Sequence, residues 1–287
     1  MNTIWVFQDT GKGLNQLDFL LLCTSVIQYK KHHPTVTTVL YVDRSIYSIL
    51  GNNNALSLWD QVNTIPFSKD IDTSVFWAAA KLEVISRQKD SFRLLDHDFI
   101  VYENLDHTIE GYDCVFTNAE NGKGYYPLTS DEYIRKLSYK RRWKPTSLNV
   151  SNLFFKDAEY AQKYAKLSLK LMREFTEMKV PHSQYLIFAE QLLLYHMLVE
   201  DKVKSRPLIE EYWDCDDWYW GDKYEGEGTI DKGMYSVDTS EKSFIHYGPL
   251  KGLIKVGKAN ISYDELTQSL TNLVMNKNAT VNGFTSK

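Results

Sequence analysis

The sequence predicts an α/β fold, in which a mostly parallel, doubly wound sheet is flanked by helices and followed by a smaller second region. Short apolar strands alternate with helical segments through the first hundred residues, and such repeated units build parallel sheets. Polar and acidic residues follow several of these strands, at the edge where ligands of open α/β sheets bind. The 287 residues, 43% of them hydrophobic, suit one large domain or two interlocked ones.

The elements expected in the first half come from the period of the apolar residues. Strands read as runs of apolar and β-branched residues, and helices as apolar residues three or four positions apart. The expected strands are Ile4–Phe7, Thr37–Val42, Val62–Pro66 and one through Ser91–Tyr102. The expected helices are Asn15–Tyr29, Ser45–Leu50, Ala55–Asp60 and Thr73–Arg87.

The second half is less regular. Expected strands are Asp113–Thr117 and Asn149–Phe155. Asp157–Met178 has an apolar stripe typical of a long amphipathic helix, and a further helix is expected from Ser183, a good N-cap residue, to about Asp201. The sequence contains no internal repeat.

Composition excludes several classes of protein. A net charge of −4 argues against a general nucleic-acid coat protein. Cys23, Cys114 and Cys215 have no metal spacing and are expected to be buried thiols in a reducing cytoplasm. The first residues lack a secretory signal, and no apolar run is long enough to span a membrane. Position 16 is Gln16 where a dinucleotide fingerprint starting at Gly11 needs glycine, and no Walker-type loop occurs.

The most informative pattern is Asp96-His97-Asp98 inside an apolar run. A carboxylate is costly to bury unless it is paired or bound to a cation. In a strand, residues two apart point to the same side, so Asp96 and Asp98 are expected to face one metal ion. The alternative is a solvated turn.

Two more residues are candidates for chemistry. Glu190 has leucine and isoleucine neighbours one helical turn away in each direction. It is expected to be an acid/base or sugar-binding group, or else an exposed or lysine-paired glutamate. His246 is followed by Gly248 and Lys251, a glycine that allows close approach of an anionic ligand and a lysine that neutralises phosphate. We therefore expect His246 to be a metal ligand.

With these motifs in place, the chain resembles the GT-A nucleotide-sugar glycosyltransferases. The helix Trp77-x-x-x-Lys81-Leu82 followed by Leu95-Asp96-His97-Asp98-Phe99-Ile100 is similar to the helix and DxD strand of that fold. His246-x-Gly248-x-x-Lys251 resembles the C-terminal H-x-x-G-x-x-K motif of the glycogenin and lipopolysaccharide-galactosyltransferase group, with one residue fewer between His and Gly.

The resemblance implies a metal-dependent enzyme that moves a sugar, as hexosyl or pentosyl group, from a nucleoside-diphosphate sugar, expected to be a UDP-sugar, to an acceptor hydroxyl. It implies that Asp96, Asp98 and His246 hold Mn²⁺ or Mg²⁺. Glu190 is the implied catalytic residue, and inversion and retention both stay open. The implied donor-binding residues are Phe7, Gln8, Asp9, Lys81, His97, Asn149, Gly248 and Lys251.

The resemblance also implies a division of roles along the chain. Residues 1–118 form a nucleotide-sugar-binding half. Residues 119–275 form an acceptor half that includes the C-terminal metal and diphosphate motif. Residues 276–287 are expected to be a flexible tail.

The segment Arg135–Lys144 packs six basic and two aromatic residues into ten positions. Besides a solvated loop, it suits an anionic acceptor such as a glycan, a lipid surface or DNA, with Arg141, Arg142 and Trp143 as acceptor-binding residues. Transfer to hydroxymethylated DNA bases, which needs an accessible base, therefore stays an alternative. A non-catalytic sugar-nucleotide-binding protein is another alternative. A metal-dependent phosphoesterase would need more clusters of metal-ligating residues than the sequence contains. We expect a cytoplasmic location, with a peripheral position at the inner membrane surface left open.

Overall fold

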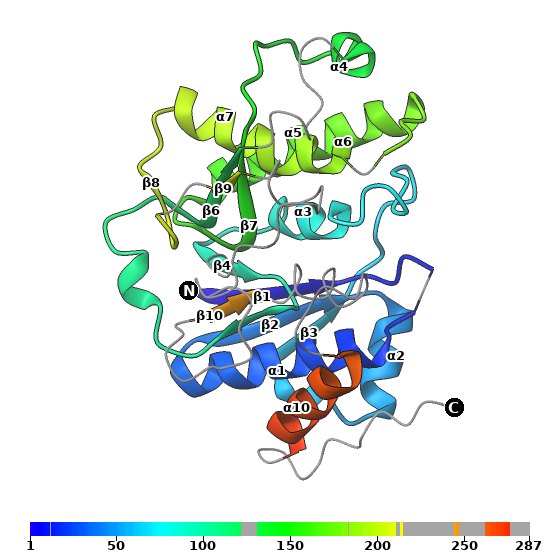
Figure 1. The fold of residues 1–287 in the computed structure, drawn as a ribbon, viewed down its shortest axis with the longest axis vertical. Helices are drawn as coiled ribbons and strands as arrows, with labels where there is room; N and C mark the ends of the chain where they lie inside the picture. Colours follow the sequence, from blue (N-terminus) through cyan, green and yellow to red (C-terminus); the bar gives the residue numbers. More distant parts are fainter. Residues whose placement is uncertain are drawn as a thin grey trace. The chain divides into compact units, whose positions relative to one another are not determined.

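The computed structural model describes residues 1–11, 13–121, 131–182, 184–210, 213–214, 244–246 and 262–275. These residues form two compact units (Figure 1). Unit 1 contains Met1–Pro66 and Leu95–His107, with the described segments 244–246 and 262–275. Unit 2 contains Phe67–Leu94 and the described residues from Thr108 to 214. The chain therefore leaves unit 1, enters unit 2 and returns, so neither unit is continuous in sequence.

Unit 1 is built on a parallel sheet with the strand order β3-β2-β1. The strands are β1 (Asn2–Phe7), β2 (Thr37–Val42) and β3 (Gln61–Thr64). Both pairs in this sheet are parallel, as the alternation of strands and helices predicts. The carboxyl ends of the strands thus share one edge, where the loop after β1 lies.

Helix α1 (Gln16–His32) begins at the N-cap Asn15, whose side chain accepts a hydrogen bond from the Asp18 amide, and most of its side chains are buried. Asp43 caps α2 (Arg44–Asn52) in the same way. The short helix η1 (Leu56–Leu58) takes the place of the expected helix after Ala55. Near the C-terminus, α10 (Tyr263–Met275) packs against α1 (Figure 1).

The expected continuous strand around the two aspartates is wrong. The chain forms β4 (Phe92–Leu95), a turn, and then β5 (Phe99–Val101). The Phe99 amide donates to the Asp96 carbonyl at 3.0 Å and closes the turn. Aspartate is a good turn residue because its side chain competes for nearby backbone groups. β10 (Phe244–His246) pairs antiparallel with β5, and η2 (Asp106–Thr108) follows β5 along the chain.

Unit 2 is built on a mixed sheet. β6 (Cys114–Asn121) and β7 (Thr146–Phe155) are antiparallel, with an irregularity between Phe116 and Asn118. β8 (Ser205–Pro207) and β9 (Trp213–Asp214) pair parallel with β6, and β4 neighbours β7.

The helices of unit 2 include the expected long helix, α5 (Ala158–Glu177). The expected helix of residues 73–87 shortens to α3 (Ala79–Ile85), because Asp72 instead organises a turn by accepting hydrogen bonds from the amide and hydroxyl of Ser74. The segment after position 183 divides into α6 (Gln184–Ile187), the π-helical turn η3 (Phe188–Leu192) and α7 (Leu193–Glu200). A short α4 (Glu132–Lys136) completes the set.

The α/β fold class is therefore confirmed, and so is the burial expected for two of the three cysteines. Cys23 and Cys114 are buried free thiols, whereas Cys215 lies outside the described residues. None of the helices in the described ranges is long and apolar enough to cross a membrane. The division of roles at residue 118 concerns binding and not compactness, so it stays a prediction, and the tail 276–287 lies outside the described residues.

One contact in unit 2 predicts how stability depends on pH. The Lys144 amide donates to Nε2 of His196 at 2.9 Å, which favours the unprotonated form of this nitrogen. Burial, with smaller contributions from the charges of Arg141 and Lys144, lowers the pKa of His196 to about 4. An unfolded histidine has a pKa near ~6.5, so between these values the unfolded chain binds a proton that the folded chain does not.

The free energy of unfolding should therefore fall by roughly 1–3 kcal/mol as the pH decreases from 6.5 to 4. Above pH 6.5 this histidine contributes no pH dependence. Urea denaturation of the wild type and of His196→Gln, each at pH 7.0 and 5.0, measures the effect. The variant should lose this part of the pH dependence, and equal pH dependence in both proteins would contradict the assignment.

Candidate functional site

The Asp96-His97-Asp98 turn is the acidic feature that the sequence singled out. Asp98 is buried, with 6% of its surface exposed, while Asp96 and His97 are half-buried. The turn thus combines a buried carboxylate with one that is accessible. The backbone forms the turn of the solvated-turn alternative, but Asp98 in that turn is buried and not solvated.

Neighbouring elements of unit 1 contact this turn. The Phe7 ring, at the end of β1, meets the His97 ring edge-on with 4.9 Å between the ring centres. The Nε2 atom of His97 lies 3.2 Å from Asp18 Oδ1. On the other side of Asp98, the Phe99 carbonyl accepts a hydrogen bond from Ser25 Oγ at 2.7 Å. Phe7 and His97, both expected to bind the donor, are therefore in direct contact.

Strand pairing brings the backbone of His246 next to this turn. In the β5–β10 pair its Cα partner is Phe99, the residue directly after Asp98. The sequence alone could not predict this pairing, since most of unit 2 lies between the two strands along the chain. Gly248 and Lys251 lie outside the described residues.

The carboxylate oxygens of this turn are suitable ligands for a divalent metal ion. Two carboxylates suit Mg²⁺ and Mn²⁺, and an imidazole from His246 would favour Mn²⁺. Among the side chains that the structure describes, no group of three or more His, Cys, Asp or Glu residues is arranged to hold a metal. For His246 only the backbone is described, so its part in a metal site stays a prediction.

The loop after β1 is organised by Asp9. Its Oδ1 accepts hydrogen bonds from the amides of Gly11 at 2.8 Å and Gly13 at 2.9 Å, and both glycines have positive φ, 91° and 69°. The Asp9 amide donates to Asp43 Oδ2 at 2.6 Å. The structure thus gives Asp9 a role in shaping the loop. Beside it, the buried Oε1 of Gln8 has no hydrogen-bond partner in the described part of the chain, which leaves this acceptor available to a ligand.

Unit 2 contains a buried ion pair between two predicted site residues. Lys81 Nζ lies 2.8 Å from Glu190 Oε1, and the exposed fractions of the two side chains are 12% and 5%. This is the lysine-paired alternative for Glu190, with a partner that was itself expected to bind the donor. A lysine at this distance favours the carboxylate form of Glu190.

Glu190 belongs to the π-helical turn η3, a rare conformation that often occurs at functional sites. Tyr164, on α5, donates its hydroxyl to the Glu190 carbonyl at 3.1 Å. Burial, followed by the charge of Glu190, raises the pKa of Tyr164 well above its usual value, so the phenol keeps its proton. The helical period predicted the burial of Glu190 but not the π turn.

Asn149 takes part in a polar cluster between β6 and β7. Its Nδ2 donates to Glu120 Oε1 at 3.0 Å, and its Oδ1 accepts from Ser151 Oγ at 2.8 Å. The Ser151 hydroxyl also lies 2.8 Å from that of Thr117. Of these residues sequence reasoning proposed only Asn149. The alternating polar residues of the two strands were a usable signal for the others.

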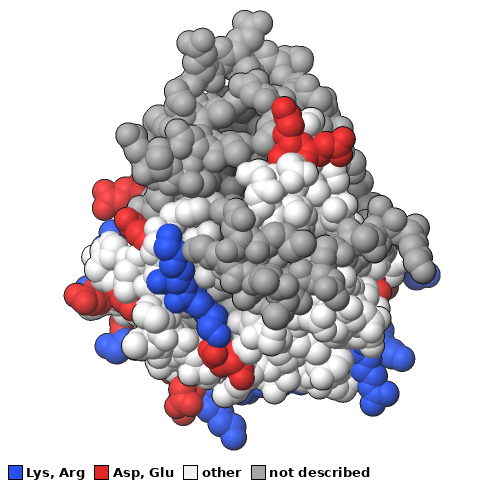
Figure 2. Space-filling model, turned by 90° about the horizontal axis from the view of Figure 1, so that it is seen from below, with Lys and Arg blue, Asp and Glu red and all other residues white. Residues whose placement is uncertain are grey.

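The basic segment is less available to an acceptor than expected. Trp143 is buried, and its ring packs against those of Phe188 and His196 at 4.5 and 5.0 Å. Arg141 is mostly buried and forms an ion pair with Glu200. Arg142 is exposed and is the member of the predicted trio that a ligand can reach. In the view of Figure 2, acidic and basic side chains are intermixed on the described surface.

The predicted residues thus fall into two groups, which lie in different units. Unit 1 holds the expected metal ligands and the expected nucleotide-binding residues: Phe7, Gln8, Asp9, Asp96, His97, Asp98 and His246. Unit 2 holds the expected catalytic, sugar-binding and acceptor-binding residues: Lys81, Asn149, Glu190, Arg141, Arg142 and Trp143.

Fold and site together define an α/β protein with an acidic turn at the start of a buried strand. The model of a family of unknown function, DUF6734, matches residues 5–225. The chain belongs to this family. Comparison with curated protein sequences gives no match.

Several solved structures are similar to parts of this chain. One is the galactosyltransferase LgtC in complex with donor and acceptor sugar analogues, at 13% identity and a TM-score of 0.38, over 66% of this chain and 70% of that one. Another is the glycosyltransferase GlyE of Streptococcus pneumoniae TIGR4, at 12% identity and a TM-score of 0.39, over 76% of this chain. The match spans 46% of the GlyE chain, less than half its length.

Proposed function

We propose that this protein is a metal-dependent glycosyltransferase of the GT-A type, which moves a sugar from a nucleoside-diphosphate sugar to an acceptor hydroxyl. The observation that carries the proposal is the Asp96–Asp98 turn with His246 opposite Phe99 in the β5–β10 register. The register pairs the backbone of His246 with the residue directly after the two aspartates, and a donor set of two carboxylates and an imidazole would suit Mn²⁺ or Mg²⁺.

Each of these residues would have a defined role in sugar transfer. When the bond between the sugar and the diphosphate breaks, negative charge develops on the departing phosphate. A divalent ion held by Asp96, Asp98 and His246 would supply the Lewis acid that neutralises this charge. In this proposal Phe7, Gln8 and His97 bind the nucleoside. Gly248 and Lys251 serve the diphosphate.

Lys81, Asn149 and Glu190 serve the sugar and the acceptor in this proposal. The ion pair with Lys81 keeps Glu190 as a carboxylate. A carboxylate can accept the proton of an acceptor hydroxyl, or stabilise positive charge at the sugar carbon. Inversion uses the first role and retention uses the second, and the ionised state suits both.

For the acceptor, the ion pair of Arg141 with Glu200 and the burial of Trp143 weaken the proposal of a polyanionic surface at residues 135–144. They favour a glycan or lipid-linked hydroxyl over DNA. A protein that binds the sugar nucleotide without turning it over is the alternative from another class. Turnover distinguishes the two.

The test incubates the purified protein with Mn²⁺ and a panel of nucleotide sugars, and measures release of nucleoside diphosphate. We expect slow hydrolysis of one donor in the absence of acceptor and faster release once glycosides are added. Hydroxymethylated duplex DNA serves as the competing acceptor in the same assay. Binding of a donor with no release under any condition would favour the non-catalytic alternative.

A further inference from the structure

Helix α1 contacts the chain on both sides of Asp98. Asp18, in the first turn of the helix, accepts a hydrogen bond from Nε2 of His97 at 3.2 Å. Ser25, two helical turns later, donates its hydroxyl to the Phe99 carbonyl at 2.7 Å. Asp18 and Ser25 are seven positions apart, about two helical turns, so the two side chains lie on the same face of the helix. One helix face thus holds the residue before Asp98 and the residue after it.

Each of these contacts is oriented by a further hydrogen bond. The N-cap residue Asn15 donates to Oδ2 of Asp18 at 2.6 Å, which fixes the carboxylate that faces His97 through Oδ1. The Trp5 indole donates to Ser25 Oγ at 2.9 Å, and both side chains are fully buried. Because a serine hydroxyl has a single hydrogen, accepting from Trp5 leaves that hydrogen for the Phe99 carbonyl.

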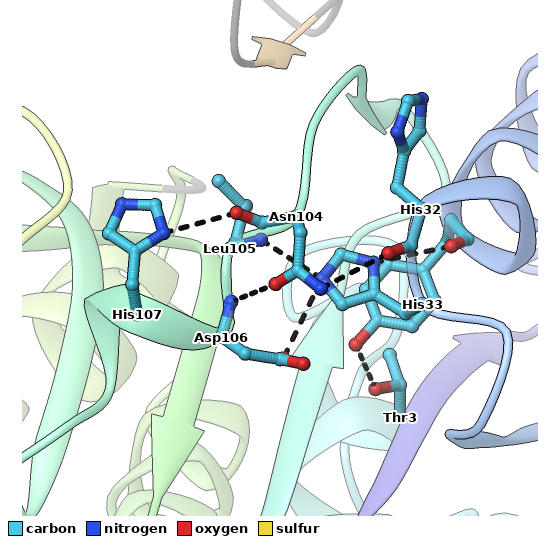
Figure 3. Close-up of polar contacts among 8 residues, drawn as sticks. Thr3, His32, His33, Asn104, Leu105, Asp106 and His107 are labelled. Carbon is cyan, nitrogen blue, oxygen red and sulfur yellow. Dashed lines mark hydrogen bonds and ion pairs between the residues drawn. The ribbon is translucent and has the colours of Figure 1, made fainter.

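The C-terminal end of α1 makes a third set of contacts, with the residues that follow β5. Figure 3 shows His33, which directly follows α1, next to the residues that come after β5. The Leu105 amide donates to His33 Nε2 at 3.0 Å, and the His33 ring stacks on that of Tyr29 with 4.1 Å between centres. Nearby, Asn104 Nδ2 donates to the His32 carbonyl at 3.2 Å. Helix α1 is therefore docked along the whole stretch from the acidic turn to residue 105.

We propose that α1 preorganises the metal-binding turn, with Asp18 and Ser25 as positioning residues. This inference rests on the proposed function, because it assumes that Asp96 and Asp98 hold the ion. Two carboxylates one residue apart repel each other in a free turn, and ordering that turn around an ion costs conformational entropy. When α1 holds His97 and Phe99, much of this ordering is complete before the ion arrives.

A preorganised turn has a consequence for the order of binding. The free protein should bind Mn²⁺ without any nucleotide, because the turn does not depend on the donor diphosphate for its shape. Partners that orient metal ligands typically contribute about 10–100-fold to metal affinity. The same scale is expected here for each of the two contacts from α1.

The test measures Mn²⁺ binding to the nucleotide-free protein by electron paramagnetic resonance, together with hydrogen exchange of residues 96–101. Asp18→Ala and Ser25→Ala should each weaken Mn²⁺ binding by about 10–100-fold and speed exchange in the turn. Asp18→Asn should recover part of the affinity, since its amide oxygen accepts the same hydrogen bond. Thr24→Val is the matched control, because Thr24 is a buried α1 residue whose hydroxyl has no partner in the described part of the chain.

The outcomes separate this inference from the proposed function. A wild-type protein that binds no Mn²⁺, with or without nucleotide, would overturn both. Wild-type binding that stays unchanged in Asp18→Ala and Ser25→Ala would overturn the inference alone. Should Ser25→Ala unfold, the Asp18 variants decide the question, because 23% of the Asp18 side chain is exposed and its replacement leaves no cavity in the core.

Discussion

Asp98→Ala is expected to abolish release of nucleoside diphosphate from the donor while the protein stays folded. Metal-assisted charge neutralisation contributes several kcal/mol to such reactions, so the loss should be about 1000-fold or more. The substitution also shortens a side chain that is only 6% exposed. The melting temperature of the metal-free variant is measured to verify that the protein stays folded. Activity and Mn²⁺ affinity are measured side by side.

Asp70→Ala is the control for this variant. Asp70 has the same spacing to Asp72 as Asp96 has to Asp98, but its carboxylate forms an ion pair with Arg173 and is 57% exposed. Its removal should leave activity within twofold. Removing the metal from the wild type with EDTA should reproduce the loss seen in Asp98→Ala, and Mn²⁺ should restore the rate. Full turnover in excess EDTA would exclude a metal-dependent reaction.

Glu190→Gln is expected to lower kcat by at least about 100-fold, the scale of a lost acid/base group, with little change in donor affinity. It should also destabilise the fold. Removing one partner of a buried ion pair costs roughly 3–5 kcal/mol, because the other charge is left uncompensated. Lys81 would be that remaining charge, with 12% of its side chain exposed.

A second substitution separates the two effects. Lys81→Met combined with Glu190→Gln removes both charges, so the double variant should regain most of the stability of the wild type while remaining inactive. Glu83→Gln is the matched control. Glu83 lies on the same helix as Lys81, has a side chain 6% exposed against 5% for Glu190, and pairs with Arg87 at 3.4 Å. Glu83→Gln should lose stability without losing the catalytic step. Recovery of kcat in the double variant would mean that the pair is only structural.

The fold could be predicted from the sequence where one local signal dominated. β1, β2 and α5 follow the pattern of their apolar residues, because α5 buries one face and β1 and β2 bury consecutive residues in the middle of the strand. The acidic turn was placed inside a strand because apolar residues flank it on both sides. Apolar runs do not show where backbone pairing stops. The hydrogen bond from Phe99 to the Asp96 carbonyl decides that point.

Long-range contacts explain what the sequence could not predict about the site. The burial of Glu190 followed from its helix period, but its pairing with Lys81 depends on how α3 and η3 each pack against α5. The basic residues near position 141 read as a surface patch, because composition does not show that Glu200 on α7 forms an ion pair with Arg141. In the same way, no pattern links Asp18 with His97. Such pairs are set by tertiary structure.

The interleaving of the two units has a consequence for folding during synthesis. α1 emerges early from the ribosome, but its partner α10 is made only after all described parts of unit 2. Long sequence separation between contacting elements slows folding, and unfinished apolar surfaces attract chaperones or aggregate. Unit 2 can complete its core first, while the side of α1 that contacts α10 stays uncovered until α10 has been synthesised. Nascent chains stalled before residue 263 should therefore stay sensitive to protease in unit 1, and release of the full chain should protect it.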